Sequence, residues 1–77
     1  MTGYTAQAWA GIGTLRQEIT GCTRDTAHAV AREAMRTGLT GRVIPPDLCS
    51  ADWTVYDPTR GVRTGRYEEI TLVFGDA

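Results

Sequence analysis

One helix signal restricts the fold of this chain more than any other feature. Residues 24–37 carry small apolar side chains at helical spacing, with Thr23 as a candidate N-cap and Gly38 where a left-handed residue would end the helix. The predicted buried stripe consists of Ala27, Val30, Ala31 and Ala34, with Met35 at its boundary. Because this stripe is mostly alanine, the helix can lie close to a sheet or to another helix.

The segment before the helix, residues 4–20, fits two structures. As a hairpin, residues 4–10 and 14–20 alternate apolar and polar side chains around a glycine-containing turn. As a helix, the same segment would carry Gly11 and Gly13 in its interior, and each would cost about 1 kcal/mol relative to alanine. We therefore favour the hairpin and keep the helix as the alternative.

The segment after the helix contains signals for further strands. Residues 42–44 predict a short strand, which residues 45–46 would end because both are proline and lack the donor that a sheet requires. Residues 52–57 are rich in strand-forming side chains, and residues 67–74 predict the returning strand. Residues 57–61 carry proline and glycine where a turn requires them, and we predict a hairpin loop over residues 58–65, which is longer than most hairpin loops.

These elements predict an α+β fold in two layers. One helix would pack on a mainly antiparallel sheet, in the chain order β-β-α-β-β. The chain of 77 residues is long enough for one domain, residues 1–77, and too short for two. If residues 4–20 were helical, the alternative would be a winged helix-turn-helix.

Two resemblances accompany these alternatives. Residues 21–39 resemble the turn and recognition helix of winged-helix regulators, which implies DNA contact through residues 23–26 and a wing formed by the hairpin around residues 60–66. The chain departs from that pattern upstream, where a first helix is missing. Residues 4–37 resemble the β-β-α start of small antitoxin-like and double-stranded-RNA-binding-like modules. That resemblance implies two strands leading through a threonine-capped turn into an alanine-rich helix.

Charge and cysteine content argue against several classes of protein. The formal net charge is −1, so the strong positive field of a typical nucleic-acid-binding domain is absent. The two cysteines are too few for a secreted disulfide scaffold, and the N-terminus has no signal-peptide pattern. No apolar stretch approaches the length of a membrane span. We therefore expect a cytoplasmic protein with reduced thiols and no membrane partner.

The cations are all arginine, and lysine and asparagine are both absent. Lysine and asparagine have A-rich codons, so this composition indicates a GC-rich gene, such as that of a high-GC bacterium or its phage. Because arginine is the only cation in the chain, some arginines must serve solubility alone.

The residues that could carry catalysis or bind a metal are few. His28 is the only histidine, and we place it opposite the alanine stripe, toward solvent, with Arg24 and Arg32 as its helical neighbours. Cys22 precedes the helix N-terminus, where the helix dipole can stabilise a thiolate. The spacing of Cys22, His28 and Cys49 matches no zinc pattern. We therefore predict no enzymatic activity, no metal site and no cofactor.

Two arginine-rich features and one tryptophan are candidates for binding. On the helix, the candidates recur at every fourth position and form a basic ridge: Arg24, His28, Arg32 and Arg36. In the predicted hairpin loop, the candidates are Arg60, Arg63 and Arg66. Trp9 shares its predicted strand face with Thr5 and Gln7, away from the alanines, and exposed aromatic side chains mark binding surfaces. The forked donors of arginine suit phosphate and carboxylate alike, so they do not identify the partner.

We expect a small non-enzymatic binding module, an accessory protein of phage or mobile-element type, that acts through protein–protein interaction or self-association. A sheet covered by one helix leaves a second face and two edges available for such contacts. The alternative is a nucleic-acid-binding module, for DNA or RNA, that uses the basic helix ridge and the arginine-rich loop.

Overall fold

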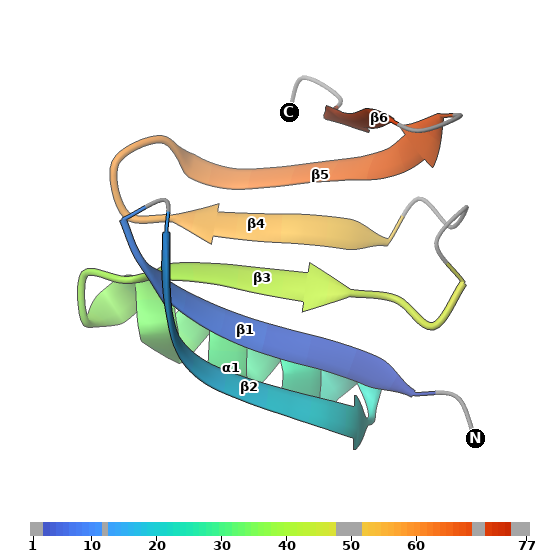
Figure 1. The fold of residues 1–77 in the computed structure, drawn as a ribbon, viewed down its shortest axis with the longest axis horizontal. Helices are drawn as coiled ribbons and strands as arrows, with labels where there is room; N and C mark the ends of the chain where they lie inside the picture. Colours follow the sequence, from blue (N-terminus) through green and yellow to red (C-terminus); the bar gives the residue numbers. More distant parts are fainter. Residues whose placement is uncertain (1–2, 12, 48–51, 69–70, 75–77) are drawn as a thin grey trace.

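The computed structural model describes residues 3–11, 13–47, 52–68 and 71–74, with the backbone alone for residues 66–68 and 71–74. Its elements, labelled in Figure 1, are strands β1 (Tyr4–Ala10) and β2 (Thr14–Cys22), helix α1 (Arg24–Arg36), and strands β3 (Thr40–Ile44), β4 (Trp53–Asp57), β5 (Gly61–Glu68) and β6 (Thr71–Phe74).

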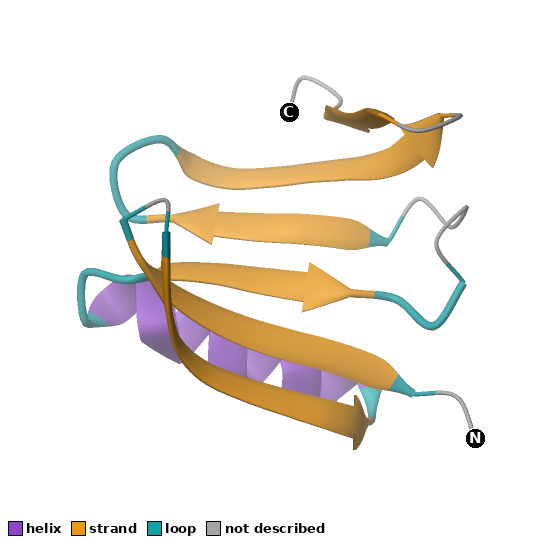
Figure 2. Cartoon of the chain, in the orientation of Figure 1, coloured by secondary structure: helices purple, strands orange, loops and turns teal. Residues whose placement is uncertain are grey.

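The strands form one antiparallel sheet of six strands, in the order β2-β1-β3-β4-β5-β6. Helix α1 covers one face of this sheet, chiefly over β1 and β3 (Figure 2). The predicted two-layer α+β fold is therefore confirmed, and so is the N-terminal hairpin. The winged helix-turn-helix alternative is wrong, because residues 14–22 form a strand where that fold requires a helix.

The helix forms where the sequence predicts it, and both ends are capped as expected. The Thr23 hydroxyl accepts a hydrogen bond from the Thr26 backbone N–H at 3.2 Å, which satisfies one first-turn donor. Gly38 has a φ of +87°, the left-handed conformation that ends many helices. Within the described ranges, no helix combines the length and the apolar character needed to cross a membrane.

The alanine stripe brings the helix close to the sheet. Ala27, Ala31 and Ala34 are buried, and Ala31 lies directly over Gly41 of β3. A Cβ atom at Gly41 would lie 2.6 Å from the Ala31 carbonyl carbon, so a side chain there would force the two backbones apart. The buried core cluster consists of Ala6, Ala27, Ala31, Val43 and Tyr56. The alanines of this cluster allow the helix to lie close to the sheet.

The predicted long loop over residues 58–65 is wrong. The Asp57 carboxylate accepts hydrogen bonds from two backbone N–H groups of a tight turn, those of Thr59 at 2.8 Å and Arg60 at 3.1 Å. β5 then begins at Gly61, whose φ of +88° favours glycine. The turn predicted over residues 57–61 is therefore confirmed, and only the extension of the loop to residue 65 is wrong.

This correction changes the setting of the three C-terminal arginines. Arg60 lies in the turn, whereas Arg63 and Arg66 lie on β5, paired with Val55 and Val73. The return strand predicted over residues 67–74 is divided between the end of β5 and β6. The side chain of Arg66 lies outside the described part of the chain.

β2 and β6 form the two edges of the sheet. The register of β2 against β1 shifts at two places, once at Arg16 and once beside Gly21, which has a φ of +67°. Bulges of this kind twist an edge strand and interrupt the row of backbone groups that a further strand would need. The irregular β2 edge weakens the expectation that both edges are available for pairing.

Candidate functional site

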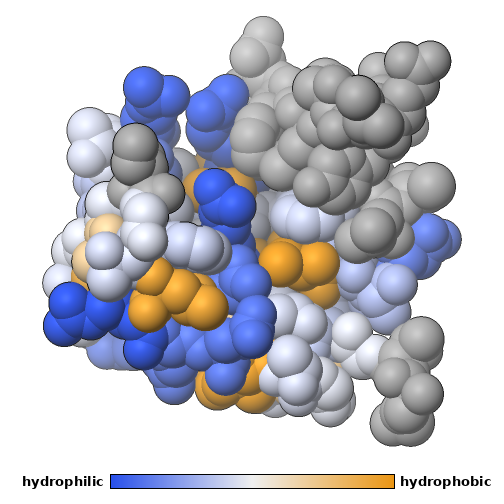
Figure 3. Space-filling view, in the orientation of Figure 1, coloured by the Kyte–Doolittle hydropathy of each residue, from blue (hydrophilic) through white to orange (hydrophobic). Residues whose placement is uncertain are grey.

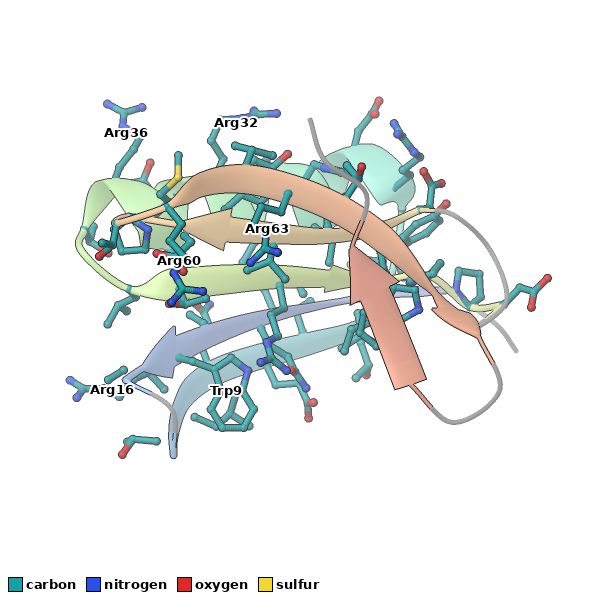
Figure 4. All side chains as sticks on the ribbon, turned by 90° about the horizontal axis from the view of Figure 1, so that it is seen from above. Trp9, Arg16, Arg32, Arg36, Arg60 and Arg63 are labelled. Atoms are coloured by element: carbon teal, nitrogen blue, oxygen red, sulfur yellow. The ribbon has the colours of Figure 1, made fainter. Side chains whose placement is uncertain are left out.

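Strand alternation divides the candidate residues between the two faces of the sheet. On β1, Ala6 and Ala8 face the helix and are buried, so Trp9 lies on the opposite side. We call this side, which carries Trp9, Arg42, Val55 and Arg63, the open face. Figure 4 shows the two groups: Trp9, Arg60 and Arg63 point to the open side, and Arg32 and Arg36 lie on the helix side. The predicted binding residues therefore do not form one continuous surface.

The Trp9 ring is held in place by its neighbours. Its indole Nε1–H donates a hydrogen bond to Gln7 Oε1 at 2.9 Å. The Gln7 amide in turn donates to Glu18 Oε2 at 2.7 Å, which ties β1 to β2. The Arg42 guanidinium lies over the indole, 5.6 Å from the ring centroid, in a cation–π arrangement. The half-buried ring is thus oriented on both its edge and its face.

A depression of about 280 Å³ lies beside this tryptophan. Its lining includes Trp9 of β1, Thr40 and Arg42 of β3, Val55 and Asp57 of β4, and Arg63 of β5. Figure 3 looks onto this face of the molecule, where hydrophilic side chains separate several small hydrophobic patches. The depression therefore combines two guanidinium groups, an aromatic ring and an aliphatic side chain.

The acidic member of the depression is already engaged by the turn. Hydrogen bonds from the backbone N–H groups of Thr59 and Arg60 hold the pKa of the Asp57 carboxyl below its usual range. Nearby guanidinium groups lower this pKa further, in smaller measure. Asp57 therefore stays ionised at neutral pH and offsets only part of the positive charge around the depression.

On the helix side, Arg24 of the predicted ridge forms an ion pair. Its Nε–H donates to Asp52 Oδ2 at 3.1 Å, and the Tyr4 hydroxyl donates to the same oxygen at 2.7 Å. The hydrogen bonds from Arg24 and Tyr4 lower the pKa of Asp52, and the bond to Asp52 raises the pKa of Tyr4. This cluster joins the start of α1, β1 and β4, which is a structural role.

His28 does not face solvent, so our placement of this residue is wrong. Its Nδ1 shares a hydrogen bond of 2.7 Å with the Tyr56 hydroxyl, and the two rings meet edge to face with centroids 5.8 Å apart. Among the described residues its Nε2 is buried without a hydrogen-bond partner. Successive helical residues differ by about 100°, so His28 lies beside Ala27 rather than opposite it, and β4 extends beneath that flank. Burial, and then the charge of Arg24, lowers the pKa of His28.

The remaining ridge arginines also have local contacts. The Arg32 guanidinium lies 5.8 Å from the centroid of the Tyr56 ring. Arg36 is 3.9 Å from Glu33, a long and exposed ion pair that contributes little to stability. The ridge is therefore a set of separate contacts along the helix flank over β4.

Of the three residues considered as metal ligands, Cys22 has a clear local environment. The Cys22 thiol is free and donates a hydrogen bond to the Tyr4 carbonyl oxygen at 3.2 Å. Cys49 lies outside the described residues. In the described ranges, no group of three or more metal-ligating side chains comes together.

Sequence reasoning missed Arg42, the residue that covers the tryptophan. The signal was present, because Val43 is an obvious core residue and its neighbour on a strand must point to the other face. The register then pairs Arg42 with Gln7 on one side and Val55 on the other. Only the strand order shows that Arg42 and Trp9 are neighbours.

A second hollow, of about 430 Å³, lies between α1 and the first two strands. It is lined mainly by small apolar side chains, among them Ala8, Ala29, Val30, Ala34 and Leu39. Its lining contains one charged residue, Glu33, and no aromatic ring. The hollow offers few groups that could orient a ligand.

Comparisons with known proteins give no relative for this chain: no family model matches it, and neither a curated protein nor a solved structure matches significantly.

Proposed function

We propose that this chain is a small non-enzymatic binding module that engages a protein partner through the open face of its sheet. The observation that carries the proposal is the Trp9 ring, which is held by Gln7 and covered by Arg42 beside a depression on the face opposite the helix. Tryptophan and arginine are the side chains most enriched at the energetic centres of protein interfaces.

The fixed orientation of the ring favours association. A side chain that is already ordered loses less conformational entropy when a partner covers it. Leu15, which pairs with Trp9 across β1 and β2, is 42% exposed and extends the apolar surface beyond the ring. A partner that covers both side chains would therefore gain apolar contact at a low ordering cost. Self-association is the form of this proposal in which the partner is a second copy of the chain.

The proposal is tested by comparing variants of the two faces. Tagged wild-type protein, Trp9→Ala and Arg36→Gln would be expressed in the organism of origin, and co-purifying proteins quantified by mass spectrometry. We expect a specific partner to be retained by wild type and by Arg36→Gln, whose side chain lies on the helix side, and lost by Trp9→Ala. Sedimentation of the purified chain reports self-association. A partner retained equally by all three proteins would contradict the assignment of the open face.

Nucleic-acid binding is the second candidate, and one observation favours it. Arg60 and Arg63 point to the same side of the sheet as Trp9, so guanidinium groups and an aromatic ring share one surface. Against it, Arg42 already occupies a face of the indole on which a base would stack, and the net charge is −1. For these two reasons we propose protein binding before nucleic-acid binding.

A salt titration separates the two candidates. Labelled single-stranded and duplex DNA and RNA would be titrated at about 50 and 200 mM salt, a range over which phosphate contacts lose orders of magnitude in affinity. We expect no binding at the lower salt. Tight binding that falls steeply with salt and is weakened by the double variant Arg60→Ala and Arg63→Ala would put nucleic acid first.

A further inference from the structure

The open face carries one cross-strand row whose chemistry changes from acidic to basic. The register pairs residues in succession across β2, β1, β3, β4 and β5: Glu18, Gln7, Arg42, Val55 and Arg63. Neighbouring strands are about 4.8 Å apart, so the two arginines are separated by about 10 Å with one valine between them. This geometry places an aliphatic floor between two guanidinium groups.

Among the described residues that line the depression, two arginines outnumber one carboxylate, that of Asp57. Glu18 lies at the far end of the row and accepts the Gln7 amide, and Asp57 uses a carboxylate oxygen to close the turn. Arg42 and Arg63 line the depression itself, and Arg60 points to the same side of the sheet. The depression is therefore complementary to an anionic group small enough to enter about 280 Å³.

The arrangement favours a carboxylate over a nucleotide. Guanidinium groups form paired, charge-assisted hydrogen bonds with carboxylates, and the flanking groups of a peptide can rest on Val55 and on the edge of Trp9. A nucleotide would instead need the indole face, which Arg42 covers. An extended peptide also matches the sheet, because its alternate side chains point to the same side.

We propose that the depression between Arg42 and Arg63 binds the carboxylate of an acidic side chain on an extended segment of a protein partner. This inference rests on the proposed function and names the chemistry of its partner. The neighbouring apolar side chains of that segment cover the exposed part of the Trp9 ring, beside the nearly buried Val55.

The experiment uses two matched peptides. One is a capped hexapeptide of alternating glutamate and valine, and the other replaces each glutamate with glutamine. Each is titrated into ¹⁵N-labelled protein while the Trp9 indole N–H and the arginine Nε–H signals are followed by NMR. We expect the glutamate peptide to shift the signals of Trp9, Arg42 and Arg63, and the glutamine peptide to leave them unchanged. Equal shifts from both peptides, or none from either, would overturn the inference.

Variants locate the site. Arg42→Gln and Arg63→Gln are each expected to weaken binding of the glutamate peptide roughly tenfold, as loss of a charge-assisted pair does. Arg42→Lys keeps the positive charge but not the forked donor geometry, so its affinity for the peptide is expected to lie between those of wild type and Arg42→Gln. Arg36→Gln on the helix side is the control and is expected to bind like wild type. Amide spectra report whether each variant is folded, and unchanged binding by folded Arg42→Gln would overturn the inference.

A competing ligand and the co-purification experiment distinguish failure of the carboxylate inference from failure of the proposed function. If oligothymidine of about 12 nucleotides shifts the same signals and displaces the peptide, the carboxylate inference is wrong and nucleic acid takes its place. If the peptide does not bind while Trp9→Ala still loses a specific partner, the inference fails and the proposed function stands. If the peptide does not bind and Trp9→Ala also retains that partner, the carboxylate inference and the proposed function both fail.

Discussion

The two faces of this sheet are built from alternate residues of the same strands, yet they differ in every physical respect. The face under α1 is built around alanine, Gly41 and Val43, whose small size allows the helix to approach the sheet, and Tyr56 packs at the flank of the helix. The open face carries a tryptophan, two arginines and a depression. The comparison shows that one strand supplies different kinds of side chain to the two faces, because its residues alternate between them. Substitutions on the two faces are therefore expected to have separable effects.

The largest expected effect is at the closest contact on the helix side. Gly41→Ala is expected to lower the free energy of unfolding by about 3 kcal/mol, because the added methyl group overlaps the backbone of Ala31 and the backbones must separate. Gly13→Ala is the control, since nothing lies within 4 Å of its Cβ position. Urea denaturation measures both variants. Equal stability of the two would show that the helix does not depend on this close approach.

The second prediction compares two valines, one covered by the helix and one not. Val43 is fully buried, so Val43→Ala is expected to cost about 2 kcal/mol of stability from lost apolar burial. Val62 is 45% exposed on β5, and Val62→Ala is expected to change the free energy of unfolding by less than about 0.5 kcal/mol. Denaturation midpoints of the two variants, measured against wild type, compare the two losses of stability. A comparable loss at Val62 would mean that its side chain is covered in solution.

The third prediction concerns pH and the histidine at the helix flank. Burial lowers the pKa of His28 below its ordinary value of 6.5, so the folded protein binds this proton less readily than the unfolded chain. Stability is therefore fully present above pH 6.5 and is expected to fall as the pH drops from there through the lowered pKa. Asp52 and Asp57 also have lowered pKa values, but the stability that they contribute is lost only below about pH 4.

Denaturation midpoints between pH 7.5 and 5 measure this effect. His28→Gln keeps a polar side chain but cannot be protonated, so its stability is expected to vary less over the same range. A pH dependence that is identical in the two proteins would remove His28 as its cause.

The last prediction concerns the open face, where the expected effect on stability is small. Arg42→Gln removes the cation over Trp9 and is expected to cost no more than about 0.5–1 kcal/mol. Its effect on the tryptophan should be clearer. In a Trp53→Phe background, the remaining Trp9 emission is expected to shift to the red and to become more accessible to acrylamide, whereas Arg36→Gln leaves it unchanged. Unaltered emission in Arg42→Gln would show that the guanidinium does not cover the ring.

The elements with strong local signals were predictable from the sequence. The helix followed from its alanine spacing and caps, and the hairpin followed from the two glycines that a helix would not tolerate. The loop prediction failed at Asp57, because a single side chain that caps a turn shortens a loop without altering its composition. The placement of His28 failed because the helix sits to one side of the sheet and β4 reaches beneath its flank.

The candidate site was predictable only in part. The alternation of β1 correctly put Trp9 opposite the alanines, since side-chain direction along a strand is a local property. The basic ridge and the arginine loop were inferred from spacing along the chain. The structure divides them between two faces and pairs Arg24 with Asp52, which is far away in the sequence.

The sequence by itself determined where the helix and most strands form, and which side of each strand is apolar, because caps, glycines and periodicity act over a few residues. Only the tertiary structure decided that β3 lies between β1 and β4. That order brings Arg42 over Trp9 and Arg63 one strand beyond Val55. Strand order depends on which apolar surfaces bury together, and that is a property of the whole chain.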